Sequence, residues 1–162
     1  MWKEQIHPDE LQGRRRNKKG NIKHGADSGV GREEVKMPLV RISLMKKGRE
    51  GFGEKVGQVV YLTMCNTLNV PEKDNFQVIT EHDGQGLVFD PAYLDIPRTD
   101  GIVFIQITLN EGRSVEMKKA FYKELAETLN KQLGIRQEDV LINLVEVKKE
   151  NWSFGNGVAQ YI

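Results

Sequence analysis

Four stretches of the chain have strand-like patterns of apolar and polar residues, and these predict four strands. The stretches are 38–45, 76–81, 102–109 and 140–147. A period of two residues is typical of a strand with one buried face. The third stretch is instead almost continuously apolar, which indicates a central strand buried on both faces.

Two longer stretches repeat their apolar residues at steps of three or four, and these predict helices. The first covers 49–68 and ends before Pro71. The second begins after Ser114, a residue type that favours helix N-caps, and ends near Leu133. Three glycines weaken the first helix by about 1 kcal/mol each relative to alanine: Gly51, Gly53 and Gly57. We therefore expect tertiary packing to hold the first half of that helix.

The two halves of this region match each other at a constant offset of 65 residues. Val40–Leu44 fall on Ile105–Leu109, and Asp74 falls on Asp139. Agreement across strand, helix and strand indicates an internal repeat.

Each half is a β-α-β unit, at about 38–81 and 103–147. The two strands of such a unit are parallel and joined by a right-handed crossover. Two units related by a pseudo-two-fold axis predict an α/β (α+β) fold, with a four-stranded mixed sheet and both helices on one face. The other face stays uncovered, and the aromatic tail 151–162 is too apolar for water. Both features predict an oligomer.

Composition narrows the function classes. The 162 residues include 24 basic and 23 acidic side chains, a balance that gives no sign of a nucleic-acid or membrane partner. The one cysteine, Cys65, excludes an internal disulfide, and we expect a buried structural thiol. No apolar run is long enough to span a bilayer. We expect a soluble, cytoplasmic protein with no metal site and no cofactor.

The segment 1–36 differs from the rest. Nine basic and six acidic residues lie in it, which leaves 15 basic and 17 acidic residues in 37–162. Its few apolar residues follow no period, so we expect a disordered extension. Arg32–Lys36 can be encoded by a purine-rich stretch resembling a bacterial ribosome-binding site, which favours a mis-assigned start and translation from Met37. A passive tail and a basic arm that contacts nucleic acid are the alternatives.

Pro38 is the position where the two matching halves differ most in chemistry. Its counterpart is Val103, an ordinary strand residue. Proline is tolerated as the first residue of a strand, so a purely structural role is one reading. Met37 precedes it, and cells remove an initiator methionine before a small residue such as proline. The product would carry a free secondary amine at the head of a strand.

Four short motifs stand out in 37–162: Met37-Pro38-Leu39-Val40, Val70-Pro71-Glu72-Lys73-Asp74, Arg113-Ser114-Val115-Glu116-Met117-Lys118 and Trp152-Ser153-Phe154-Gly155-Asn156-Gly157. Together they resemble the tautomerase superfamily (4-oxalocrotonate tautomerase-like), in particular the fused-subunit branch that includes malonate semialdehyde decarboxylase. The resemblance covers the whole predicted domain 37–162 and not the segment before it.

The resemblance implies a site as well as a fold. It implies that Pro38 is the catalytic group, with Asp74 and Arg113 as catalytic residues and Arg113 also binding the substrate. Trp152, Phe154 and Tyr161 are expected to line the substrate pocket. It further implies a homotrimer. Glu111 stands where the decarboxylase has a second arginine, which weakens the case for decarboxylation of that particular substrate.

Structural roles are the alternatives for these residues. Arg113 could be solvated at a helix start, although the helix dipole disfavours a cation there. Asp74 could be a turn residue after Pro71. Trp152 and Phe154 could be interface packing.

Three functional hypotheses follow. The first is a cofactor-independent tautomerase for small 2-oxo or enol acids, in which Pro38 is the general base. The second is a decarboxylase or hydratase of a three-carbon acid that uses the same proline. The third is a non-catalytic oligomeric module that binds a small ligand. It gains weight if the chain keeps Met1, because Pro38 is then a tertiary amide without a basic nitrogen.

Overall fold

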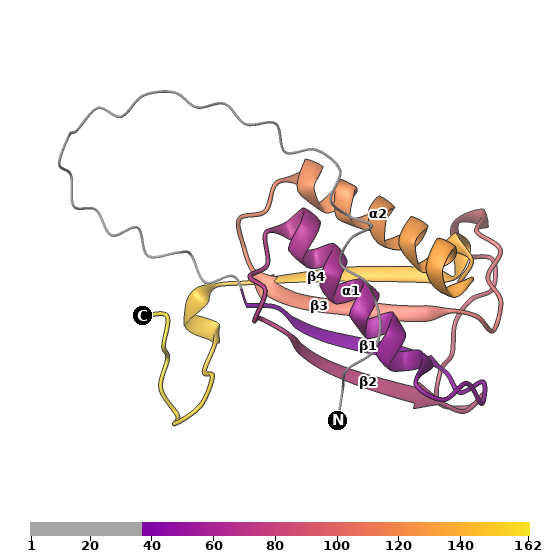
Figure 1. Cartoon of the computed structure of the whole chain (residues 1–162), viewed down its shortest axis with the longest axis horizontal. Helices are drawn as coiled ribbons and strands as arrows, with labels where there is room; N and C mark the ends of the chain where they lie inside the picture. Colours follow the sequence, from indigo (N-terminus) through magenta and orange to yellow (C-terminus); the bar gives the residue numbers. More distant parts are fainter. Residues whose placement is uncertain (1–36) are drawn as a thin grey trace. The chain divides into compact units, whose positions relative to one another are not determined.

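The computed structural model describes residues 37–162 of the chain. The predicted disordered extension 1–36 lies outside the described residues. The elements, in order, are β1 (Leu39–Met45), α1 (Phe52–Leu68), β2 (Phe76–His82), β3 (Val103–Asn110), α2 (Val115–Leu133) and β4 (Val140–Val147). Three 3-10 turns, η2 (Tyr93–Asp95), η3 (Gln137–Asp139) and η4 (Lys149–Asn151), lie in the connections and the tail (Figure 1).

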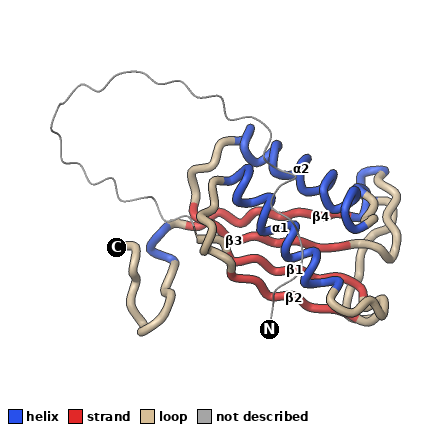
Figure 2. Tube along the Cα trace, viewed as in Figure 1, coloured by secondary structure: helices blue, strands red, loops and turns tan. Residues whose placement is uncertain are grey.

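The strands form one mixed sheet in the order β2-β1-β3-β4. β1 and β2 are parallel, β3 and β4 are parallel, and the central pair β1 and β3 is antiparallel. Arg41 pairs with Gln106, which is its own counterpart at the offset of 65, so the pseudo-two-fold axis passes between these two residues. Both helices lie on one face of the sheet (Figure 2). The predicted fold class is confirmed.

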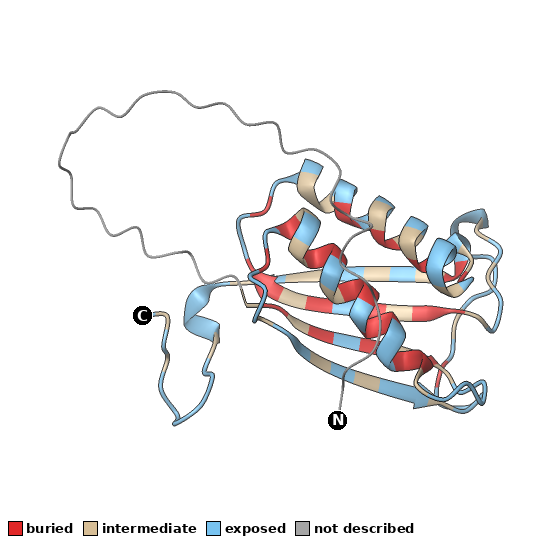
Figure 3. Ribbon diagram, in the orientation of Figure 1, coloured by how far each residue is buried: buried red, intermediate tan, exposed pale blue. Residues whose placement is uncertain are grey.

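The core lies between the helices and this face of the sheet, where buried residues line the facing surfaces (Figure 3). On the opposite face Phe76 is 52% exposed and Val78 is 42% exposed. β3 is central, as predicted, but Gln106 on its outer face is exposed. Among residues 37–162 no element covers the second face, so the expectation that this strand is buried on both faces is wrong for the described part of one chain.

The glycines of α1 allow the helix to lie close to β2. A Cβ atom on Gly53 would lie 2.7 Å from Ile79 Cγ2, and one on Gly57 would lie 2.2 Å from Gln77 Oε1. The Gln77 amide also donates to the Gly57 carbonyl at 3.0 Å. Packing against β2 therefore holds the glycine-containing half of the helix, as the sequence suggested.

Ser114 caps α2 by accepting a hydrogen bond from the Met117 amide at 3.2 Å. The cap fixes where the helix begins and so fixes the connection from β3, which contains Arg113. Within 37–162, no helix is long and apolar enough to cross a membrane.

Candidate active site

Pro38 is a buried residue at the head of β1. The next residue, Leu39, pairs with Phe76 of β2 on one side and with Thr108 of β3 on the other. Pro38 therefore lies beside the turn that precedes β2, which contains Asp74, and beside the last residues of β3. This end of the sheet also receives the end of α1 and the start of the tail (Figure 1).

Arg113, in the connection between β3 and α2, has a buried side chain that is 7% exposed. Its Nε donates to the Leu68 carbonyl at 3.2 Å, and its Nη1 donates to the Asn110 carbonyl at 2.9 Å. Leu68 is the last residue of α1, where carbonyls lack partners within the helix and the dipole is negative. The alternative that Arg113 is solvated at a helix start is therefore wrong: its guanidinium is held at the negative end of the other helix.

Asn110 is a further residue of this candidate site, and the sequence did not reveal it. It is the last residue of β3, is 4% exposed, and its side-chain oxygen accepts a hydrogen bond from the Trp152 indole nitrogen at 2.8 Å. Because its carbonyl also binds Arg113, Asn110 connects the guanidinium to the aromatic tail. A polar residue that ends an apolar strand was the only available signal in the sequence.

The aromatic residues of the tail form a continuous series. The rings of Trp152 and Phe154 are stacked at 5.4 Å with an interplanar angle of 15°. Phe154 then meets Tyr161 edge-on at 4.9 Å and 69°. This series leads from the Asn110–Arg113 contact toward Tyr161, whose hydroxyl lies near the backbone of Met37. Side chains far apart in the sequence thus meet at the head of β1.

Asp74 and Tyr161 provide two buried polar atoms at this end of the sheet. Asp74 Oδ2 is closed to solvent and has no hydrogen-bond partner among the described residues, whereas the Tyr161 hydroxyl, also closed to solvent, lies against the Met37 backbone. Burial raises the pKa of the Asp74 carboxyl. Burial, and then the negative charge of Asp74, raises the pKa of Tyr161, while the Met37 backbone acts in the opposite direction. The charge of Asp74 therefore acts on Tyr161, and the parallel pairing of β1 with β2 puts Asp74 at the same end of the sheet as Met37.

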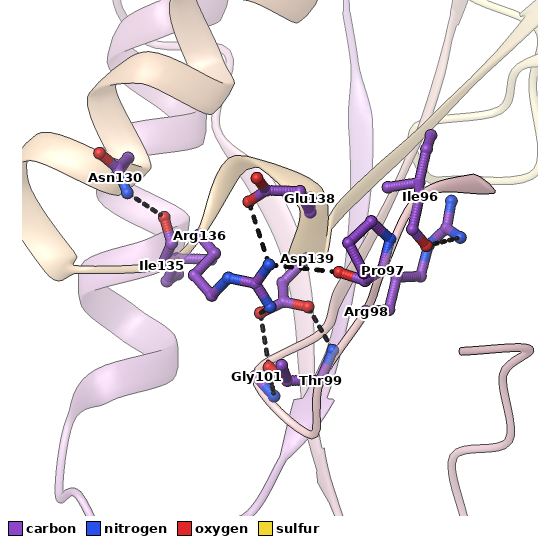
Figure 4. Close-up of polar contacts among 10 residues, drawn as sticks. All are labelled: Ile96, Pro97, Arg98, Thr99, Gly101, Asn130, Ile135, Arg136, Glu138 and Asp139. Carbon is purple, nitrogen blue, oxygen red and sulfur yellow. Dashed lines mark hydrogen bonds and ion pairs between the residues drawn. The ribbon is translucent and has the colours of Figure 1, made fainter. Parts of the chain in front are cut away.

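The counterpart of Asp74 in the second unit has a different environment. Asp139 is 1% exposed and accepts hydrogen bonds from the Thr99 amide and hydroxyl, both at 2.6 Å. Arg136 lies 3.8 Å away and also donates to the Pro97 carbonyl (Figure 4). Asp139 thus holds the segment that leads into β3. The residue equivalent to Thr99 in the first unit is position 34, outside the described residues.

A pocket of about 350 Å³ lies elsewhere, between the start of α1 and β2. It is lined by Gly51, Gly53, Glu54, Gln77, Ile79 and Glu81 and contains none of the predicted site residues. Across residues 37–162, no three His, Cys, Asp or Glu side chains are placed to hold a metal ion.

Comparisons with known proteins give the family. The profile of the family described as "Tautomerase enzyme" matches residues 74–155. The "Probable tautomerase YusQ" of Bacillus subtilis (strain 168) is 41% identical over 126 residues, which cover 78% of this chain and 99% of YusQ. The chain belongs to the tautomerase superfamily. The sequence motifs had indicated this family, and that prediction is confirmed.

Solved structures extend the likeness within the tautomerase superfamily. A crystal structure of FG41 malonate semialdehyde decarboxylase inhibited by 3-bromopropiolate matches with a TM-score of 0.70 and 30% identity, and covers 76% of this chain and 93% of that one. A fused 4-OT protein, described as a symmetric trimer, matches with a TM-score of 0.61 and 17% identity, and covers 74% and 94% of the two chains. The second likeness shows the shared fold alone.

Proposed function

We propose that this protein is a cofactor-independent tautomerase of small 2-oxo or enol acids, with Pro38 as an amino-terminal general base. The observation that carries the proposal is the meeting of Pro38, Asp74, Arg113 and the aromatic tail at one end of the sheet. Membership of the tautomerase superfamily supports an enzyme of this class.

The base requires a chain that begins at Pro38, and we propose translation from Met37 followed by removal of that methionine. The match to YusQ supports this start, because it spans 126 residues and nearly the whole of that relative. The region 37–162 has the same length. In a longer chain the nitrogen of Pro38 forms a peptide bond with Met37 and carries no basic electron pair.

The chemistry follows from the position of the amine. An α-amino group has a pKa of about 8 in water. Burial and a nearby guanidinium both disfavour the charged form, and so bring the pKa of the amine closer to neutrality. Such a group can take a proton from an enol hydroxyl and return it to carbon.

In this scheme Arg113 binds the substrate carboxylate and stabilises charge that develops on the enolate oxygen. The carbonyls of Leu68 and Asn110 hold the guanidinium in place before substrate arrives. Trp152, Phe154 and Tyr161 exclude water from the reacting atoms.

We expect Arg113→Lys to raise KM for a carboxylate substrate by about tenfold, because an ammonium group cannot bind two carbonyls and a carboxylate with the fixed geometry of a guanidinium. Steady-state kinetics with phenylenolpyruvate would measure the change. Arg49→Lys is the matched control, since Arg49 is exposed near the opposite end of α1. Equal KM values for wild type and Arg113→Lys would remove Arg113 from substrate binding.

Intact mass and N-terminal sequencing of the protein produced from its own gene test the proposal directly. A mature chain that begins with Pro38 and converts phenylenolpyruvate to its keto form is the expected result. A chain that retains Met1 would contradict the proline mechanism and favour a non-catalytic ligand-binding module.

Decarboxylation or hydration of a three-carbon acid by the same proline is the second candidate. The likeness to FG41 malonate semialdehyde decarboxylase favours it. The exposed Glu111, at the position where the resemblance placed a second arginine, weighs against it. Release of CO₂ from malonate semialdehyde at a rate above that of phenylenolpyruvate conversion would select this reaction over tautomerisation.

We also propose a homotrimer that resides in the cytoplasm. The uncovered sheet face, with the exposed side chains of Phe76, Val78 and Leu141, supports association between copies. The fused 4-OT protein of the same fold is described as a trimer. Light scattering should give the mass of three chains, and the mass of one chain would overturn the proposed assembly.

A further inference from the structure

Asn110 binds two functional parts of the candidate site through two different oxygen atoms. Its backbone carbonyl accepts a hydrogen bond from Arg113 Nη1 at 2.9 Å, and its side-chain oxygen accepts one from the Trp152 indole at 2.8 Å. Both oxygens belong to one residue, so a displacement at one of them changes the direction of the other. Asn110 is only 4% exposed, and water therefore does not readily replace either partner.

The end of the sheet holds Asn110 in place. Asn110 pairs with Val147, the last residue of β4, and the amide of Glu111 donates to the Val147 carbonyl at 3.0 Å. The chain then turns through η4, where the Trp152 amide donates to the Lys149 carbonyl at 3.3 Å. The indole of Trp152 returns to Asn110, so the start of the tail is attached to the sheet at both ends. Asn110 therefore sets the direction in which the tail leaves the sheet.

The guanidinium of Arg113 needs a fixed plane if it is to bind a carboxylate through two parallel hydrogen bonds. Its Nε donates to the Leu68 carbonyl at 3.2 Å, and its Nη1 donates to the Asn110 carbonyl. Two bonds from different nitrogen atoms fix the plane, whereas a single bond would leave the group free to rotate about it. A shift of Asn110 would therefore cost Arg113 its orientation and leave its charge unchanged.

We propose that Asn110 is a positioning residue that couples the aromatic tail to Arg113 and so strengthens the preference of the site for carboxylates. The inference rests on the proposed function, because it takes Arg113 as the group that binds the substrate carboxylate. It adds that a residue outside the substrate contacts aims this guanidinium. Coupling of this kind is reciprocal, so order in the tail favours carboxylate binding and carboxylate binding favours order in the tail.

The test compares a carboxylate with its neutral amide. 3-Phenylpropanoate and 3-phenylpropanamide would be titrated calorimetrically into the protein produced from its own gene. We expect wild type to bind the carboxylate about 30-fold more tightly, because a guanidinium–carboxylate pair is charge-assisted. Asn110→Leu keeps the backbone carbonyl and removes the bond to the indole. Its preference should fall to about fivefold, since one buried hydrogen bond is worth roughly five- to tenfold in an equilibrium constant.

The ratio of the two affinities distinguishes a positioning role from a merely structural one. A looser fold or a displaced aromatic ring would weaken both ligands alike and leave the ratio unchanged. Asn66→Leu is the matched control, since it alters an exposed asparagine on α1 and should retain the wild-type ratio. A wild-type ratio in Asn110→Leu would overturn the inference, as would a wild type that binds the two ligands equally or binds neither.

Trp152→Phe removes the same hydrogen bond from the other side while keeping an aromatic ring. The ratio should fall in this variant and fall no further when Asn110→Leu is added, because both changes break one bond. Losses that multiply in the double variant would show independent effects and overturn the coupling. If Asn110→Leu does not fold, an unchanged ratio in Trp152→Phe overturns the inference and a lowered ratio supports it.

Turnover of phenylenolpyruvate, measured on the same samples, separates this inference from the proposed function. Neither titration involves a proton transfer by Pro38. A wild type without turnover, in which Asn110→Leu still lowers the ratio, would contradict the tautomerase and leave the role of Asn110 standing. Full turnover by wild type together with equal ratios in wild type and Asn110→Leu would overturn the role of Asn110 alone.

Discussion

Replacing Pro38 by alanine in the mature chain is expected to lower kcat/KM for phenylenolpyruvate by about 100-fold. General base catalysis contributes about 10²–10⁴-fold. Alanine at the first position still provides an amine, now primary instead of secondary, but loses the ring that fixes the nitrogen at the head of β1, so the loss should lie near the lower end. Both enzymes should lose activity as the pH falls below the pKa of the amine, about 8 in water, because the protonated amine is no base.

The matched control is Pro91→Ala, which alters an exposed proline in the long connection between β2 and β3. It should keep kcat/KM within a factor of about two. A second comparison uses the position of the start. A chain that retains residues 1–37 has no basic nitrogen at Pro38 and should be inactive. Equal activity of this longer chain and the chain that begins at Pro38 would refute the mechanism.

The sequence predicted most of the fold because its signals are local and repeated. Hydrophobic periodicity located the strands and helices. The internal repeat, in which Asp74 corresponds to Asp139, predicted the pseudo-two-fold symmetry of the sheet. The expected burial of β3 on both faces was wrong, since an apolar run such as 102–109 does not tell whether the covering layer comes from the same chain. The side chain of Gln106, on the face of β3 that points away from the helices, is exposed.

The candidate site could be predicted only in part. The motifs pointed to Pro38 and Arg113. The Arg113 side chain, however, is held in the interior by a hydrogen bond to the carbonyl of Leu68, 45 residues earlier in the chain. Asn110 had no motif, because its importance arises from a contact with Trp152 that forms after folding. Side-chain partners set by tertiary structure leave little trace in a single sequence.

The equivalent aspartates should respond to mutation in opposite ways. Asp139→Ala is expected to lower the free energy of unfolding by about 2–4 kcal/mol, because the Thr99 amide and hydroxyl lose a charged acceptor in a buried place. Asp74→Asn should leave the free energy of unfolding at pH 7 unchanged or slightly higher, since Asp74 Oδ2 has no hydrogen bond to lose. Urea unfolding at pH 7 would measure both changes.

The pH dependence of Asp74→Asn gives a sharper test. Burial raises the pKa of Asp74 in the folded protein above its ordinary value of 3.8. The folded state therefore holds this proton more tightly than the unfolded state, and the ionised carboxylate weakens the fold as the pH rises through the folded pKa. Any gain in stability from Asp74→Asn should be present at pH 7 and should shrink as the pH falls toward 3.8. A loss from Asp74→Asn as large as that from Asp139→Ala would show that both acids are structural turn residues, and would remove Asp74 from the proposed site.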